Sequence, residues 1–283
     1  MKMKEFENIV IGKSSIFALV ISIILMTAIP VLIFICWRVK HKEQTKISWL
    51  IAGAVGFIVS ARVLELGVHY FCIIADNPVS RFVNGHTAAY VIYGITMAGV
   101  FEECGRFVVM KYIMKKNRTR ENAVMYGIGH GGIEIFAVLL PGMISSLVIA
   151  VMLSTGDMTS ALGALGITEE NAAVALPSVQ AVAAFGYGKM AANVIERILA
   201  MLLHIGLTVI VFYGITQAKK SCLPVAIGLH MSMDLFAALY QRNVVPLWSV
   251  EVWAAFFTAV TVMIAMKLYR QMEDAPEHTE CVA

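Results

Sequence analysis

The apolar stretch AAYVIYGITMAGVFEECGRFVVM, residues 88–110, is long enough to cross a bilayer and carries two adjacent glutamates. Glu102 and Glu103 are followed one turn later by Arg106, and the rest of the stretch holds no other charge. A carboxylate at bilayer depth costs several kcal/mol unless it is paired or neutralised. Two adjacent carboxylates and an arginine therefore indicate a functional site inside a membrane-spanning helix.

The composition of the whole chain is that of a polytopic membrane protein. Of its 283 residues, 59% are hydrophobic and 14% are charged, and the mean hydropathy is +0.78, outside the range of soluble globular domains. A helix needs about 20 apolar residues to cross the hydrocarbon core, and helices are expected because a lone strand leaves its backbone unsatisfied in lipid. We predict a single all-α membrane domain over residues 1–283, a bundle of about seven transmembrane helices at 15–37, 48–75, 88–110, 122–155, 188–216, 221–241 and 247–268.

Lysine and arginine gather in alternate loops, and this predicts the orientation of the chain. Thirteen of the 22 basic residues follow the first, third, fifth and seventh spans, six lie in the other loops and the N-terminal segment, and three lie within spans. Because cytoplasmic loops are enriched in Lys and Arg, we predict an outer N-terminus and a cytoplasmic C-terminus. The absence of eukaryotic targeting signals from the sequence fits a bacterial plasma membrane. Segment 172–187 is predicted to be re-entrant or interfacial, because an eighth span would reverse the basic side.

The lengths of the segments and the positions of the cysteines give four smaller predictions. Segment 122–155 is too long for a simple span, since 34 residues rise about 51 Å as a helix. We expect a kink at Pro141-Gly142, or a tail along the outer surface. Residues 156–171 read as a polar outer loop and the tail 271–283 as disordered. The five cysteines have no framework spacing, and we expect free thiols.

Four spans place ionisable side chains at similar depth. Glu103 lies eight residues before Lys111, the predicted cytoplasmic end of the third span, or about 12 Å at 1.5 Å per residue. His130 and His230 each lie eight residues into their spans, and His204 lies about eleven residues from the end of its own. We therefore predict a polar cavity in the cytoplasmic half of the bundle.

Spacing within each helix supports this prediction. Three pairs lie four residues apart and so share a helix face: His130 with Glu134, His230 with Asp234, and Glu102 with Arg106. A carboxylate one turn from an imidazole can fix its tautomer. Glu102 and Glu103 point about 100° apart, so one faces the cavity and the other meets Arg106 or a neighbouring helix. Arg62 and Glu65 read as a structural pair or as residues of a secondary site.

The motifs occur in a recognisable order over roughly residues 45–245. They are Glu102-Glu103-Cys104-Gly105-Arg106, Tyr126 four residues before His130, Gly129-His130-Gly131-Gly132-Ile133-Glu134, His204, and His230 four residues before Asp234. This set resembles the type II CAAX prenyl endopeptidase and bacteriocin-processing superfamily of intramembrane proteases, and its YhfC branch above all. The resemblance implies hydrolysis of a peptide bond in a membrane protein or lipidated peptide, with the lipid bilayer as surroundings and no nucleic-acid partner.

The resemblance also implies roles for the residues. A glutamate, Glu102 or Glu103, would activate a water as general base, and His130 would hold that water or pass the proton to the leaving amine. His230 and His204 would donate hydrogen bonds to the oxyanion. Arg106 would neutralise a glutamate, while Glu134 and Asp234 would support the histidines.

Two points of the chemistry stay open at this stage. The CAAX enzymes typically have Glu-Glu-x-x-x-Arg, one residue longer than here, so either glutamate could take the catalytic place. A metal version would use Zn²⁺ on His130, His204 and His230 with Glu103. We favour the scheme without a cofactor, because no His-Glu-x-x-His motif occurs.

Two other classes of function fit a buried polar cluster. A proton-coupled secondary transporter also places Glu, Arg and His within spans, but it is expected to show repeated halves, and the sequence has none. A non-catalytic membrane scaffold is the second alternative. This chain has both glutamates of the protease motif, which favours the enzyme over the scaffold.

Overall fold

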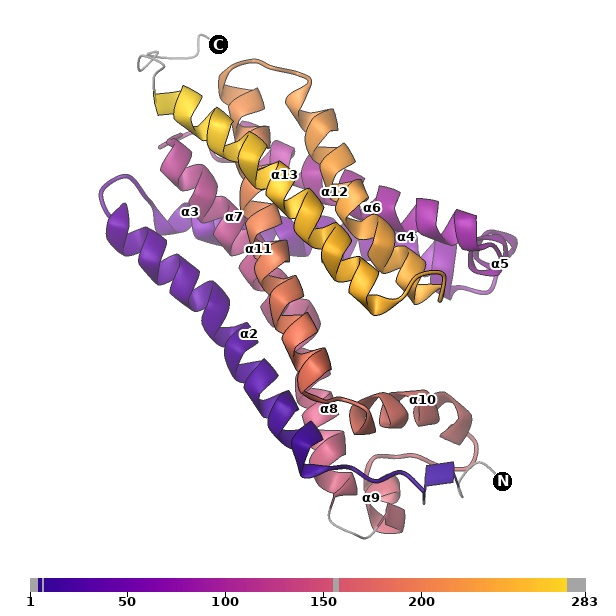
Figure 1. The fold of residues 1–283 in the computed structure, drawn as a ribbon. Helices are drawn as coiled ribbons and strands as arrows, with labels where there is room; N and C mark the ends of the chain where they lie inside the picture. Colours follow the sequence, from indigo (N-terminus) through magenta and orange to yellow (C-terminus); the bar gives the residue numbers. More distant parts are fainter. Residues whose placement is uncertain (1–4, 7, 155–157, 274–283) are drawn as a thin grey trace. The chain divides into compact units, whose positions relative to one another are not determined.

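The computed structural model describes residues 5–6, 8–154 and 158–273, and within these ranges it is helical with no strand. The helices are α2 (Lys13–Lys40), α3 (Ile47–Phe57), α4 (Leu66–His69), α5 (Pro78–Gly85), α6 (Thr87–Val108), α7 (Arg120–Glu134), α8 (Leu140–Leu153), α9 (Met158–Ala164), α10 (Ala172–Ala183), α11 (Tyr187–Thr216), α12 (Cys222–Gln241) and α13 (Leu247–Glu273), with π-helical segments η1 (Ile58–Glu65), η2 (Tyr70–Ile74), η3 (Val109–Ile113) and η4 (Ile135–Leu139) (Figure 1). The prediction of an all-α polytopic membrane protein is confirmed.

Six helical segments are long and apolar enough to cross a membrane. They are Lys13–Lys40, Ile47–Ile74, Arg120–Leu153, Tyr187–Thr216, Cys222–Gln241 and Leu247–Met272, and each corresponds to a predicted span. The remaining predicted span, 88–110, forms the helix α6 (Thr87–Val108) but is not among the six. We attribute this to its three charged residues, Glu102, Glu103 and Arg106, which lower its hydropathy.

The chain forms two compact units, Met1–Ile29 with Ile135–Arg197, and Pro30–Glu134 with Ile198–Ala283. The first unit is built on an apolar cluster that includes Leu19, Leu153, Leu162 and Val179. The prediction of a polar loop over 156–171 was wrong in part, because this segment contains the short helix α9. The helix forms there because Leu162 is buried in the cluster. Helix α10 has 12 residues and rises about 18 Å, too short to be the eighth span that the charge pattern excluded.

The predicted break near Pro141 is a change of helix type. The π-helical segment η4 ends directly before α8, in whose first turn Pro141 lies. Proline has no N–H to donate to the preceding turn, and both prolines and π-helical turns are recognised causes of helix kinks. Of the tail expected to be disordered, residues 271–273 continue α13, and residues 274–283 lie outside the described part.

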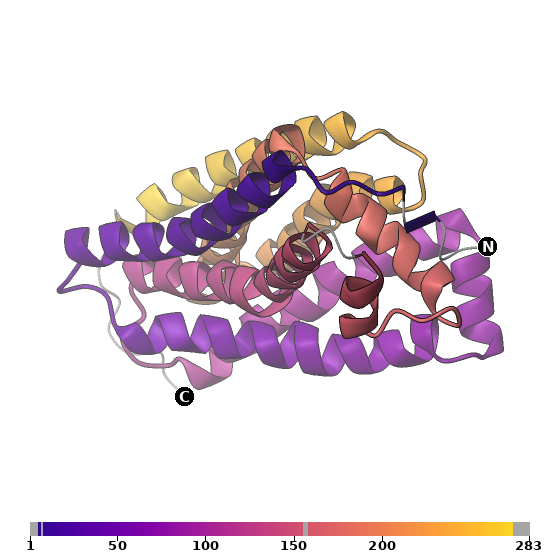
Figure 2. The ribbon, with the colours of Figure 1, turned by 90° about the horizontal axis from the view of Figure 1, so that it is seen from below.

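The second unit carries the polar cluster and is held together by close helix contacts. Helices α3 and α7 pack against each other, as do α6 and α12, and α12 and α13 (Figure 1). The segment Ile47–Ile74 runs as one continuous helix through η1, α4 and η2 (Figure 2). Helix α5, which the sequence did not predict, begins with Pro78 and is capped by the side chain of Asn77.

Glycines on α3 and α7 bring the two backbones into direct contact. A Cβ placed on Gly129 would lie 1.9 Å from the Leu50 carbonyl oxygen, and one on Gly53 would lie 2.1 Å from the Tyr126 carbonyl oxygen. On the α11 side, a Cβ on Gly127 would lie 2.7 Å from Ile205 Cα. The glycines around the predicted site histidine thus allow close helix approach, as expected from the sequence.

We expect Gly129→Ala to destabilise the protein, because its methyl group has no room against the α3 backbone. Overpacking of this kind typically costs about 1–3 kcal/mol, and here the obstructing atom is a carbonyl oxygen that cannot turn aside. The measurement is thermal unfolding of the purified protein in detergent. The matched control is Gly228→Ala on α12, where a Cβ would meet nothing within 4 Å; equal melting temperatures for the two variants would contradict the prediction.

Candidate active site

Glu103, Arg106 and His230 form one buried part of the cluster. Arg106 Nη1 donates to both carboxylate oxygens of Glu103, at 2.7 Å each. His230 Nδ1 lies 2.8 Å from Glu103 Oε1. The side chains of Glu103 and Arg106 are fully buried. The Glu103 charge is therefore neutralised by its own helix α6 and tied to α12.

Glu102 faces a different partner. Its Oε2 lies 3.0 Å from His130 Nε2 on α7 and 3.9 Å from His204 Nδ1 on α11. No other bond to Glu102 occurs within the described residues, so Oε1 is open to a further ligand. The two neighbouring glutamates thus have separate environments, one neutralised and one shared with histidines.

His204 lies at the centre of the cluster and has both ring nitrogens engaged. Arg106 Nη2 donates to Nδ1 at 3.1 Å, because a guanidinium can only donate. The hydrogen of a neutral His204 then lies on Nε2, which is 2.8 Å from Glu134 Oε2. The ring centroids of His130 and His204 are 4.9 Å apart, and those of His204 and His230 are 5.5 Å apart. Four helices therefore bring the predicted residues to one place.

Two of the three expected i,i+4 pairs have different partners. Arg106 pairs with Glu103 at i,i+3, and Glu102 is turned toward α7. Glu134 pairs with His204 of another helix, because close packing of α7 on α11 brings the two within reach. The third pair is present, with His230 Nε2 at 3.5 Å from Asp234 Oδ2.

Three buried polar atoms in this region have no hydrogen-bond partner within the described residues. They are Arg106 Nε, Tyr126 Oη and His130 Nδ1. Buried groups of this kind are usually satisfied by water or an ion. Tyr126 stacks on His130 with ring centroids 6.3 Å apart, so its hydroxyl belongs to the same polar region.

A cavity of about 290 Å³ adjoins the cluster. Its polar lining includes Glu65, Tyr93 and Asp234, and Asp234 is the partner of His230. The lining from α6 precedes Glu102 in the chain, so the cavity lies on the side of the cluster away from the basic loop that follows α6. From the sequence, the polar residues of the second span were interpreted as a structural pair or a secondary site. Their spacing could not indicate this cavity, because other helices contribute to its lining.

The cluster has a donor set that suits a divalent metal ion. Ligand atoms of Glu102, His130 and His204 all lie within 4.8 Å of one another, and the three residues are buried. Zinc ligands lie about 2.0–2.2 Å from the ion, which separates them from each other by roughly 3–4 Å. The separations of 3.0 and 3.9 Å from Glu102 Oε2 fall in that range, and the separation between the two histidine nitrogens is at most 4.8 Å. This set differs from the zinc ligands considered from the sequence: Glu102 takes the place of Glu103, whose two carboxylate oxygens both accept from Arg106, and His230 is not among the three residues.

Comparison with known proteins identifies a family and a relative. Residues 23–254 match the family described as YhfC intramembrane metalloprotease. The chain is 31% identical over 245 residues to a Bacillus subtilis (strain 168) protein described as "Uncharacterized membrane protein YhfC", which covers 86% of this chain and 92% of that protein. No solved structure matches the chain. The resemblance to the YhfC branch is confirmed, and every residue of the polar cluster lies inside the matched range.

Proposed function

Because the chain belongs to the YhfC intramembrane metalloprotease family, we propose that it hydrolyses a peptide bond of a membrane-associated substrate at the cluster of Glu102, His130 and His204. The observation that carries the proposal is the convergence of these three side chains, from three helices, in a buried setting. Such a site excludes bulk water while holding groups that can take and give protons.

Glu102 is the general base in this proposal. A base needs a carboxylate oxygen free to reach the attacking water, and Glu102 Oε1 has no bond to a described residue. Glu103 is less suited, because both its oxygens accept from Arg106 and one also meets His230. In this proposal Glu102 is therefore the base and Glu103 is a positioning residue.

The histidines share the remaining work. His130 contacts Glu102 and is placed to hold the water or pass its proton to the leaving amine. His230, between Glu103 and Asp234, is the donor proposed for the developing oxyanion. His204, with Arg106 on one nitrogen and Glu134 on the other, fixes the position of the cluster.

The same side chains would hold a divalent metal ion. Bound by Glu102, His130 and His204, the ion would supply Lewis acidity to the water. Arg106 Nη2 donates a hydrogen bond to His204 Nδ1, the nitrogen that faces Glu102. His204 could bind the ion through this nitrogen only after that hydrogen bond is broken.

The substrate we propose is a membrane protein or a lipidated peptide in a bacterial plasma membrane. The 290 Å³ cavity of Glu65 and Asp234 supplies a polar route to the cluster. With the N-terminus outside and the C-terminus in the cytoplasm, as the basic loops predict, this cavity opens toward the outer side. Water and a polar part of the substrate would then enter from that side.

The test compares the membrane proteins of cells that express either the wild-type chain or Glu102→Gln at equal levels. We expect at least one membrane protein to accumulate uncleaved with the variant, and to lose the new terminus that cleavage creates. Glu43→Gln, in an exposed loop, is the control and should match wild type. Identical membrane proteomes for wild type, Glu102→Gln and Glu103→Gln would favour the scaffold. Proton-coupled flux through the wild-type protein in proteoliposomes, lost in Glu103→Gln, would favour the transporter.

A further inference from the structure

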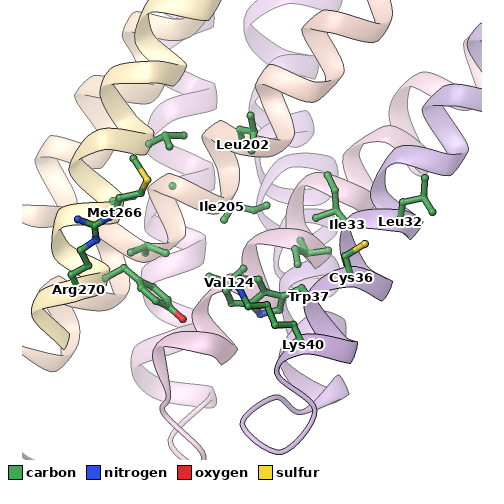
Figure 3. Close-up of a pocket in the computed structure, with 16 residues that line it drawn as sticks. Leu32, Ile33, Cys36, Trp37, Lys40, Val124, Leu202, Ile205, Met266 and Arg270 are labelled. Carbon is green, nitrogen blue, oxygen red and sulfur yellow. The ribbon is translucent and has the colours of Figure 1, made fainter. Parts of the chain in front are cut away.

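A second cavity lies between α2, α7, α11 and α13, separate from the polar cluster. Its volume is about 700 Å³, within the range of roughly 300–1,000 Å³ typical of small-molecule sites. The lining is mostly aliphatic, with Ile33, Leu202 and Met266 among its side chains (Figure 3). An apolar cavity of this size between membrane helices suits a hydrocarbon chain.

The charged side chains of this cavity lie at one end and are positive. Lys40 and Arg270 lie on its two sides in the lower part of Figure 3, and Leu202 lies above them. Both basic side chains are exposed, and neither forms an ion pair with any side chain that the structure describes. A ligand for this end therefore carries negative charge.

Aromatic side chains at the same end are held in place by the protein. Trp37 Nε1 donates to the Glu121 carbonyl oxygen at 3.1 Å, and the Tyr269 hydroxyl donates to Glu121 Oε1 at 3.1 Å. Glu121 also accepts from Arg120, so this carboxylate is already occupied and does not neutralise the two cavity cations. Trp and Tyr are enriched at the level of lipid headgroups, which places the charged end of the cavity at the membrane surface.

We infer that this cavity binds an anionic phospholipid, with an acyl chain against the aliphatic lining and the phosphate between Lys40 and Arg270. Basic pockets between transmembrane helices are a recurrent way of holding anionic headgroups. The basic loops predict that this end lies on the cytoplasmic side, where such lipids are attracted to Lys and Arg. The lipid would pack against α7 and α11, the helices that carry His130 and His204.

The test is native mass spectrometry of the purified full-length protein, incubated with equimolar phosphatidylglycerol and phosphatidylcholine of identical acyl chains. We expect wild type to retain one phosphatidylglycerol in preference to phosphatidylcholine, by roughly fivefold for each cation in contact. The double variant Lys40→Gln/Arg270→Gln should lose that preference. Leu202→Trp, which fills the apolar part, should lower retention of both lipids.

The control is Lys115→Gln/Lys116→Gln, which removes the same charge from exposed positions outside the cavity. It should keep the preference of wild type. Equal retention of the two lipids by wild type would overturn the proposal, since it would indicate ordinary contact with the surrounding bilayer. An equal loss in the control variant would also overturn it, because the preference would then come from overall charge.

Discussion

Replacing Glu102 by glutamine is expected to lower the rate of substrate cleavage by about 10²–10⁴-fold, the usual contribution of a general base. Glutamine keeps the size and one acceptor oxygen, so the bond to His130 Nε2 can persist while the proton acceptor is lost. The measurement is the rate at which purified, reconstituted protein cleaves a membrane protein identified in the proteome comparison. Glu43→Gln serves as control, and full activity of Glu102→Gln would rule out Glu102 as the base.

The metal content of the same preparations separates the two versions of the chemistry. A stoichiometric ion in wild type that is absent from Glu102→Gln and His130→Ala would assign these residues as ligands. Full activity of wild type after exhaustive chelation, with no bound metal, would instead establish the scheme in which the carboxylate acts alone. Thermal unfolding of each variant checks that the fold is retained.

The sequence was sufficient to predict the spans and to name the side chains that meet in the cluster. Apolar length determines where a helix can cross the bilayer, and six predicted spans agree with six observed segments. The ionisable residues of α6, α7, α11 and α12 lie at similar positions along their predicted spans. Because helices that cross the same bilayer run side by side, this similarity indicated that the residues meet. The family recognition followed from the order of those residues.

The pairing of the side chains could not be predicted in the same way. An arginine reaches partners at both i−3 and i−4, and the rotation of α6 decides between Glu103 and Glu102. That rotation depends on contacts such as Gly99 on α6, where a Cβ would lie 2.7 Å from Met231 Cγ. Likewise, Glu134 meets His204 because α7 and α11 approach at Gly127, and spacing within one helix carries no information on that approach.

Arg106→Met is expected to be the most destabilising of the substitutions considered. The arginine is fully buried and bonds Glu103 through two hydrogen bonds and His204 through a third. Breaking a buried ion pair by removing one partner typically costs about 3–5 kcal/mol, because an uncompensated charge is left behind. The measurement is the unfolding free energy of the purified protein in detergent.

The double variant Arg106→Met/Glu103→Gln distinguishes this cause from simple loss of packing. Without the carboxylate there is no stranded charge, so the double variant should recover a large part of the stability that Arg106→Met loses. If Glu103→Gln added its own full cost instead, the two side chains would be acting independently. The exposed pair Arg81 and Asp76, with contacts of 2.6 and 2.8 Å, provides the matched comparison. Arg81→Met breaks an ion pair of similar geometry in water, where solvent screens the remaining charge, and it should change the stability far less than Arg106→Met.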